Sequence, residues 1–402
     1  MEETNQIKDK VILHSDVNNF FASVECLNNP NLKDKPVAVT GNPKKRNGII
    51  LAKNEIAKKY GVKTGQTIGE AKALCPNLVC LPPHYNLYEE ISGDLANFYL
   101  QYTNFVEPLG LDECWLDITG CEKYLYKTGK EIADEIREKI KKEFNLTVSV
   151  GVSFSKIFAK LGSDLRKPDY TTEISFKDYK KITYDLPLNS IIGIGRRLEK
   201  KFKAIDVNTI GDFVQLDDQF LKNNMGIVGL NLKQDLTAKR FVPVLDYYKL
   251  PPPKSIGNGT TTTKDIVTKK DIEKVIYFLA EKVSARLINH KLFANTLSIT
   301  IKNKNLKTFH KSTKIPPTNS IKNLTKYAID IADKIWKYDY PVRAIRLRAS
   351  SLSSSLVKQL SFFDDNNKDF SNVLNDINKK YGKIELASDM AKYINKSSHS
   401  QE

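Results

Sequence analysis

The order of strand-like and helix-like segments along this 402-residue chain restricts its fold more than any other feature. Two separate stretches, residues 11–152 and 255–350, show the same succession of strand, helix, two strands, helix and strand. That succession is typical of a ferredoxin-like sheet. The chain is therefore expected to be a multidomain α+β protein in which this sheet occurs twice.

In the first stretch, residues 11–17 (VILHSDV) are apolar and β-prone and end on an acid, which predicts a strand. Two apolar runs around an acidic turn predict a hairpin at 106–120, and a strand is expected at 147–152. Residues 129–145 predict a helix, because Ile132, Ile136 and Ile140 form an apolar stripe at helical spacing. The other elements predicted here are helices at 18–28, 66–74 and 85–102, a strand at 36–40, and a strand at 48–53 that leads into a short helix closed by Gly61.

The second stretch follows a region with a helical pattern, residues 187–245, and three consecutive prolines at 251–253. The prolines predict a stiff linker. The elements expected beyond them are a strand at 255–263, a helix at 271–290, two strands within 293–310, a helix at 319–337 and a strand at 342–350.

The net charge of +16 is concentrated in the second stretch. Residues 254–350 contain 20 Lys and Arg against 7 Asp and Glu, which leaves +13 on about a quarter of the chain. Such asymmetry is typical of a domain that binds a polyanion, and nucleic acid is the expected partner. A lysine-rich composition from an AT-rich genome is the alternative, but it does not explain why acids are scarce in one segment only.

Three carboxylates are predicted to meet at one edge of the first sheet. Asp16 ends the first strand, and Asp112 and Glu113 occupy the hairpin turn, and these two elements are central neighbours in a ferredoxin-like sheet. Like charges so close repel unless cations neutralise them, and Mg²⁺ prefers carboxylate, water and phosphate oxygens. Taken singly, an acid in a turn or at a strand end is more often solvated than catalytic.

Four segments in order make the pattern more specific: HSDVNNFFASVE (14–25), LGLDECWLD (109–117), VGVSFSKIFAKLGSDLRKP (150–168) and IIGIGRR (191–197). Together they closely resemble the Y-family DNA polymerases, in particular the bacterial DNA polymerase IV branch, over roughly residues 10–365. The resemblance implies a right-hand polymerase with a ferredoxin-like palm (1–19 and 85–186), small fingers (20–84), a helical thumb with a helix-hairpin-helix (187–246), a β-α-β-β-α-β little finger (254–350) and a tail (351–402).

The resemblance also implies roles for single residues. Asp16, Asp112 and Glu113 match the catalytic carboxylates that hold two Mg²⁺ ions, with Mn²⁺ able to take their place, and the backbone carbonyl of Val17 matches a further ligand. Phe21 matches the steric gate, a ring that leaves no room for a ribose 2′-hydroxyl, whereas Phe20 is expected in the core. Lys160 matches a lysine that reaches the triphosphate, where it would counter developing charge.

The fingers depart from the family pattern at the triphosphate. Much of the family has a tyrosine and an arginine three residues apart, and here these positions are Glu55 and Lys58. Lys58 can meet a phosphate as a point charge but not with a bidentate fork, and Lys53 is a further candidate. Glu55 cannot take the tyrosine's part.

Other matching positions indicate how the chain would bind DNA and a partner protein. In the thumb motif, Gly193 and Gly195 would let backbone N–H groups approach a phosphate, with charge added by Arg196 and Arg197. Lysines of the basic segment, among them Lys302 and Lys304, are expected to contact phosphates. The segment 359–363 resembles the pentapeptide by which bacterial polymerases bind the sliding clamp, with Gln359, Leu360, Phe362 and Phe363 as the expected contacts.

The sequence thus predicts a monomeric, low-fidelity, template-directed DNA polymerase of translesion synthesis, with primed DNA, dNTPs and the clamp as partners and no proofreading. The five scattered cysteines form no C-x-x-C pair, so they predict neither a zinc site nor disulfides, in agreement with a reducing cytoplasm. No long apolar run and no signal peptide is found in the sequence, so neither a membrane span nor secretion is expected. A DNA-binding accessory protein is the first alternative, but the acids and the gate are intact. A nucleotide cyclase is the second, but it would need neither the thumb motif nor the basic segment.

Overall fold

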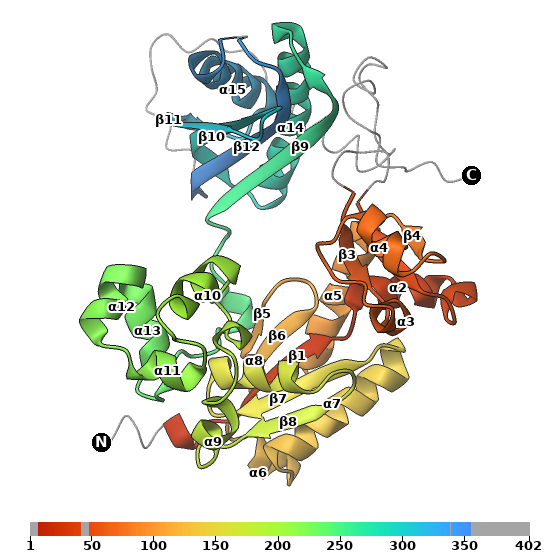
Figure 1. Ribbon diagram of the computed structural model, residues 1–402, viewed down its shortest axis with the longest axis vertical. Helices are drawn as coiled ribbons and strands as arrows, with labels where there is room; N and C mark the ends of the chain where they lie inside the picture. The colour runs from red at the N-terminus through yellow and green to blue at the C-terminus, as the bar shows by residue number, and fades with distance from the viewer. Residues whose placement is uncertain (1–6, 42–47, 338, 355–402) are drawn as a thin grey trace. The chain divides into compact units, whose positions relative to one another are not determined.

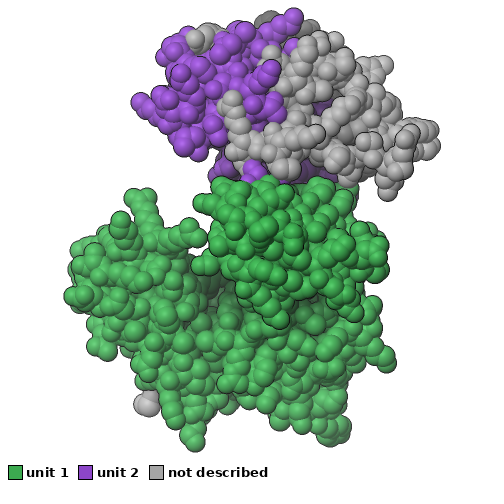
Figure 2. Space-filling view, turned by 45° about the vertical axis from the view of Figure 1, so that its right-hand side comes forward, with its two compact units in different colours: residues 1–40, 49–250 green, residues 41–48, 251–402 purple. Residues whose placement is uncertain are grey.

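The computed structural model of the chain describes residues 7–41, 48–337 and 339–354 (Figure 1). The chain divides into two compact units, residues 1–40 with 49–250 and residues 41–48 with 251–402 (Figure 2). The division after Leu250 falls at the three prolines that the sequence marks as a linker.

The first unit is organised around a five-stranded sheet in which β1 is the central strand. The strands run in the order β5 (Val106–Pro108), β6 (Glu113–Asp117), β1 (Ile12–Val17), β7 (Val148–Ser153) and β8 (Thr171–Ile174). β1 pairs antiparallel with both β6 and β7, and β8 is parallel to β7. The first four strands have the ferredoxin-like order that the sequence predicts, and β8 is an addition that it did not predict.

Helices cover both faces of this sheet, because β1 alternates its side chains between two cores. Leu13 and Val17 face the helices α5 (Tyr85–Tyr99) and α7 (Gly129–Phe144), where the predicted stripe of α7 is fully buried. A capping box of Thr128 and Glu131 satisfies backbone donors at the start of α7. The opposite face of β1 carries Ile12, His14 and Asp16 toward α8 (Lys156–Leu165).

A glycine sets the distance between α8 and the sheet. A Cβ atom at Gly151 on β7 would lie 1.9 Å from the carbonyl oxygen of Ala159 and 2.5 Å from the backbone nitrogen of Ser163. Backbone can approach backbone this closely only where a side chain is missing. Gly151 thus lets α8 lie directly on the strands, with Lys160 on the same side of the sheet as Asp16.

The predicted fingers form a small sheet with its own core, in the order β3 (Ile50–Lys53), β2 (Val37–Thr40) and β4 (Val79–Leu81). β4 was not predicted. The helices of this region are α2 (Phe20–Asn28), the short 3₁₀ turn η1 (Pro30–Leu32), α3 (Glu55–Lys59) and α4 (Ile68–Leu74). Gly61 follows α3 with a φ of +84°, in agreement with its predicted place at the helix end.

The predicted helical region is a cluster of short helices around buried aromatic rings such as Phe202 and Phe213. Its elements, with those that connect it to the sheet, are α9 (Tyr179–Thr183), η2 (Leu188–Ser190), α10 (Arg196–Lys203), α11 (Ile210–Gln215), α12 (Asp218–Met225), α13 (Ile227–Leu236) and η3 (Tyr247–Lys249). A further short helix, α6 (Cys121–Leu125), lies between β6 and α7 along the chain. After α13 the chain returns to the large sheet, where the backbone N–H of Leu245 donates to Glu107 and that of Tyr247 donates to the carbonyl of Asn104.

The second unit is one antiparallel sheet with two helices on one face. The strands run in the order β11 (Thr308–Thr318), β10 (Phe293–Asn303), β12 (Val342–Ser353) and β9 (Ser255–Ile266), and the helices are α14 (Lys269–Asn289) and α15 (Ile321–Ile335). The predicted succession of elements is confirmed, although three of the strands are longer than expected. Ile345, Leu347 and Ala349 face the helices, whereas Arg346 and Arg348 between them are exposed.

Two further findings bear on the sequence analysis. No helix of the described residues is long and apolar enough to span a membrane. All five cysteines are free thiols, and Cys75 and Cys114 are buried.

Candidate active site

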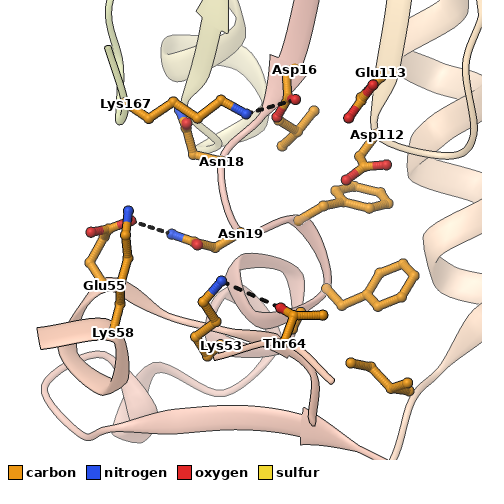
Figure 3. A pocket seen from close by; sticks show the side chains of 15 residues that line it. Asp16, Asn18, Asn19, Lys53, Glu55, Lys58, Thr64, Asp112, Glu113 and Lys167 are labelled. Carbon is orange, nitrogen blue, oxygen red and sulfur yellow. Dashed lines mark hydrogen bonds and ion pairs between the residues drawn. The ribbon is translucent and has the colours of Figure 1, made fainter. Parts of the chain in front are cut away.

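A pocket of about 310 Å³ opens between the end of β1 and the small sheet of the fingers region. Figure 3 shows Asp16, Asp112 and Glu113 at one end and Lys53, Glu55, Lys58 and Thr64 at the other. The residues that line it are Asp16, Val17, Asn18, Asn19, Phe20, Phe21, Leu51, Ala52, Lys53, Glu55, Lys58, Thr64, Asp112, Glu113 and Lys167.

The three predicted carboxylates meet at this pocket. Asp16 is paired with Glu113 across the β1–β6 ladder, and the backbone N–H of Val17 donates to the carbonyl of Asp112 at 2.9 Å. The ammonium of Lys160 lies 3.3 Å from a carboxylate oxygen of Asp16 and 3.0 Å from one of Glu113. Residues nearly a hundred positions apart are therefore held together by strand pairing, in agreement with the expected convergence.

Burial affects the protonation of these acids unequally. It raises the pKa of Asp16 to about 6, although Lys167 and Lys160 favour the ionised form. It also raises the pKa of Asp112, with Glu113 adding like-charge repulsion. For Glu113 burial acts in the same direction, but His14 and Lys160 outweigh it and lower the pKa to about 2. The site therefore favours added positive charge beside Asp16 and Asp112.

Lys167 is a site residue that the sequence analysis missed. Its ammonium lies 2.8 Å from Asp16 and 2.8 Å from Asp164, which also pairs with Lys160 at 3.2 Å. The pKa of the neighbouring Lys160 is raised to about 12: burial opposes its charge, but the carboxylates of Asp164, Asp16 and Glu113 outweigh burial. Lys167 stands at the end of the motif segment 150–168, and this position was the available signal.

His14 is buried directly behind Glu113. Its Nδ1 is 2.8 Å from the hydroxyl of Ser163, which itself donates to the carbonyl of Lys160. Its Nε2 faces a carboxylate oxygen of Glu113 at 3.5 Å, a long contact that favours the ionised form of Glu113. Burial lowers the pKa of His14, which favours the neutral ring.

The donor set fits divalent cations in its chemistry. A buried carboxylate, Asp16, and a half-buried one, Asp112, both have raised pKa values, and with Glu113 beside them they offer the oxygen ligands that Mg²⁺ uses. Even so, no group of three His, Cys, Asp or Glu side chains among the described residues is drawn together as a metal cluster. Lys160 and Lys167 pair with Asp16, and their ammoniums offset its negative charge.

Phe21 lies in the first turn of α2 and forms part of the pocket wall. Its ring is stacked on that of Tyr88, with the centroids 4.2 Å apart and the planes 12° apart, and it meets Tyr85 edge-on. Tyr88 in turn donates its hydroxyl to Glu25. Phe20 is buried, as expected. The Phe21 ring is thus held from behind by a side chain that is itself anchored.

The fingers side of the pocket carries positive side chains, Lys53 and Lys58, and one negative side chain, Glu55. Lys53 donates to Thr64 at 3.4 Å, and burial together with the nearby Lys58 lowers the pKa of Lys53. Lys58 is 3.3 Å from Glu55, whose carboxylate also accepts a hydrogen bond of 2.8 Å from the amide of Asn19. Both predicted fingers contacts, Lys53 and Lys58, line the pocket, but Lys58 is paired with the acid beside it.

The candidate DNA contacts are distributed over both units. In the first, Gly193 has a φ of +96°, Gly195 is the N-cap of α10, and Arg196 and Arg197 are exposed. In the second, Lys302 is half-buried near the end of β10, and Lys304 is exposed in the turn that follows.

Two exposed arginines on β12, Arg346 and Arg348, were not predicted as contacts. They lie opposite Gly259 and Gly257 of β9, where the absence of a side chain leaves the arginine stems room. The alternation of apolar residues and arginines in IRLR (345–348) was the available signal. The predicted clamp residues Gln359, Leu360, Phe362 and Phe363 lie outside the described residues.

Comparison with known proteins gives the family. The model of the impB/mucB/samB family matches residues 15–164, and that of the family's C-terminal domain matches residues 253–362. The DNA polymerase IV of Acetivibrio thermocellus is 42% identical over 361 residues, which cover 89% of this chain and 90% of the relative. The chain belongs to the DNA polymerase IV family.

Further DNA polymerase IV relatives and solved Y-family structures agree with this. The DNA polymerase IV of Bacillus velezensis is 32% identical over 382 residues, which cover 93% of this chain and 91% of the relative. The Y-family polymerase chimera Dbh-Dpo4(243-245)-Dbh has the same fold, with a TM-score of 0.75 at 24% identity over 86% of this chain and 100% of that chain. The chain is therefore a DNA-directed DNA polymerase of the Y family, with a part in DNA repair and translesion synthesis.

Proposed function

We propose that the chain adds dNTPs to a primer 3′-hydroxyl by two-Mg²⁺ nucleotidyl transfer, with low fidelity and without proofreading. The observation that carries the proposal is the meeting of Asp16, Asp112 and Glu113 at one end of a pocket whose other end carries Lys53 and Lys58. Carboxylates at one end suit metal ions, and ammoniums at the other suit the phosphates of a nucleotide.

In the proposed complex, the side chains of Asp16, Asp112 and Glu113 and the backbone carbonyl of Val17 hold the two ions. When bound, Mg²⁺ or Mn²⁺ would lower the pKa of the attacking hydroxyl and offset the charge that develops on the leaving pyrophosphate. The protein supplies a dry and partly built site, because Asp16 is only 5% exposed and strand pairing fixes it opposite Glu113.

The lysines are proposed to act on the nucleotide's phosphates. Lys160 and Lys167 both pair with Asp16, so that any cation bound there would free their ammoniums for other anions. Lys53 and Lys58 at the opposite end of the pocket are the fingers contacts in this proposal. Each ammonium would act as a point charge rather than as a planar fork.

Phe21 is proposed as the steric gate. Its ring cannot retreat easily, because it is stacked on Tyr88 at 4.2 Å. A sugar with a 2′-hydroxyl would clash with a ring that is held in place, and rejection by clash is an effective form of selectivity. Low fidelity is proposed from the small fingers, whose sheet has only three short strands.

The proposed partners are primed DNA, dNTPs and the sliding clamp, for a monomeric cytoplasmic enzyme. The loop and helix start at Gly193, Gly195, Arg196 and Arg197 would bind backbone phosphates of the duplex. The exposed basic residues of the second unit would bind phosphates as well, which predicts strongly salt-dependent affinity. The clamp assignment rests on the sequence of residues 359–363 alone.

Primer extension on an undamaged template, with Mg²⁺ and all four dNTPs, tests the proposal. Wild type should extend the primer, Asp112→Ala should not, and Asp34→Ala should behave as wild type because Asp34 is an exposed acid outside the pocket. A folded wild type that binds primed DNA but does not extend it would favour the accessory-protein alternative. Single-turnover misinsertion rates as low as those of a replicative enzyme would contradict the proposed low fidelity.

A further inference from the structure

Glu55 is an acid in a place where the proposed function calls for cations. It lies with Lys53 and Lys58 at the fingers end of the pocket, and it is the single acid at that end among the described lining residues (Figure 3). A triphosphate carries several negative charges, so a carboxylate beside its binding lysines opposes its approach.

The Glu55 carboxylate occupies donors that an anion would otherwise use. One of its oxygens lies 2.8 Å from the amide nitrogen of Asn19 and 3.3 Å from the ammonium of Lys58. Asn19 itself lines the pocket, directly after the β1 end that carries Asp16. Although partial burial opposes it, the Asn19 amide and the Lys58 ammonium lower the pKa of Glu55, so this anion stays charged at neutral pH.

A purely local role does not account for this arrangement. Acids are favoured in the first turn of a helix, and Glu55 is the first residue of α3. However, the side chain of Asn54 already caps α3, through a hydrogen bond from the backbone N–H of Ala57. The hydrogen bond from Asn19, the N-cap of α2, reaches Glu55 across the pocket and is no part of the α3 cap.

We propose that Glu55 is an internal competitor for the triphosphate: its carboxylate occupies Asn19 and Lys58 until a nucleotide displaces it, and this weakens nucleotide binding. The inference rests on the proposed function, because it takes this pocket as the nucleotide site. Lys58, which is 47% exposed but paired with Glu55, is accordingly expected to contribute less to phosphate binding than an unpaired lysine at this position would. The affinity for the incoming nucleotide is thereby set partly by how readily its triphosphate replaces the Glu55 carboxylate at Asn19 and Lys58.

Direct binding of inorganic triphosphate tests the inference without the need for turnover. Isothermal titration of wild type, Glu55→Gln and the control Asp34→Asn with inorganic triphosphate, in excess Mg²⁺, compares two variants that each lose one negative charge. Glu55→Gln should bind about fivefold more tightly than wild type, equivalent to about 1 kcal/mol, and Asp34→Asn should bind as wild type does. Equal affinities for wild type and Glu55→Gln would overturn the inference.

Primer extension kinetics provide the second measurement. In Glu55→Gln the KM for the dNTP should fall by a similar factor, because the competing carboxylate is removed from the nucleotide's binding contacts. The kcat should stay within about twofold, because Asp16, Asp112 and Glu113 at the other end of the pocket are unchanged. The loss of affinity on Lys58→Ala should be larger in the Glu55→Gln background than in wild type, because Lys58 is unpaired there. A loss of the same size in both backgrounds would contradict the competition.

The outcomes separate the two proposals. Failure of wild type to extend primers, with tighter triphosphate binding by Glu55→Gln, would reject the polymerase mechanism and retain the competition. If wild type extends primers and this requires Asp112, but Glu55→Gln changes neither the triphosphate affinity nor the KM, the polymerase mechanism is retained and the competition by Glu55 is rejected.

Discussion

Replacing Asp16 by asparagine is expected to abolish primer extension and yet to stabilise the metal-free first unit. Asp16 is buried, and its pKa in the folded chain is raised to about 6, from about 4 in an unfolded chain. The folded state therefore holds a proton more tightly than the unfolded state, and stability falls as the pH rises through this interval. Asparagine has nearly the same shape and no charge to bury.

The magnitude follows from the size of the shift. A difference of about two pKa units corresponds to about 3 kcal/mol at pH 7.5, and to about half of that at pH 5, where Asp16 is mostly protonated in the fold. The lysine partners do not cancel this gain, because Lys160 keeps Glu113 and Asp164, and Lys167 keeps Asp164. The variant should therefore be more stable by up to about 3 kcal/mol at pH 7.5.

Urea unfolding followed by tryptophan fluorescence is a suitable assay. The chain has two tryptophans, Trp115 beside the site and Trp336 in the second unit, so a Trp336→Phe background reports on the first unit alone. Wild type and Asp16→Asn are compared with EDTA at pH 7.5 and pH 5. Adding Mg²⁺ should stabilise wild type and leave the variant unchanged, since only wild type retains the full ligand set.

Two results would refute this reasoning. If Asp16→Asn were no more stable than wild type at pH 7.5, the ion pairs of Asp16 with Lys160 and Lys167 would outweigh its burial. If the gain were the same at pH 7.5 and pH 5, it would have a cause other than the buried charge.

Three further predictions follow from the same site. The Mg²⁺ concentration for half-maximal extension should rise as the pH falls through about 6, because protons then compete for Asp16, and a flat profile between pH 5.5 and 7.5 would exclude that competition. Phe21→Ala should incorporate ribonucleotides at least about tenfold better relative to deoxynucleotides, as measured by the ratio of kcat/KM values, whereas an unchanged ratio would show that Phe21 is not the gate. Deletion of residues 359–363 should leave extension of short primers intact and remove its stimulation by the sliding clamp, and retained stimulation would place the clamp contact elsewhere.

The fold could be predicted largely because its elements have clear periodicity. The α7 stripe of Ile132, Ile136 and Ile140 defines a helix within one residue of its observed end, and the alternation in β12 defines a strand. The short helices α6 and α9 and the site helix α8 were missed. The missed strands, β4 and β8, have three and four residues and only partial burial. Strands so short are held by pairing with β2 and β7, which no local pattern reveals.

The site could be predicted as a set of residues but not as a set of contacts. The meeting of Asp16 with Glu113 follows from strand order, since neighbouring strands bring their ends together. Lys167 was missed although it ends the motif segment 150–168, because its contact with Asp16 depends on how the chain turns after α8. The hydrogen bond from Asn19 to Glu55 likewise joins two elements that pack only in the folded chain.

Gly151 also limits how this protein can diverge. A single methyl group at that position would collide with the backbone of Ala159 and Ser163, so any lineage that gained it would also have to move α8. A shift of α8 would carry Lys160 away from Asp16, and Ser163 away from His14. The distance between α8 and the sheet is therefore inherited as one unit with the ion pairs that depend on it.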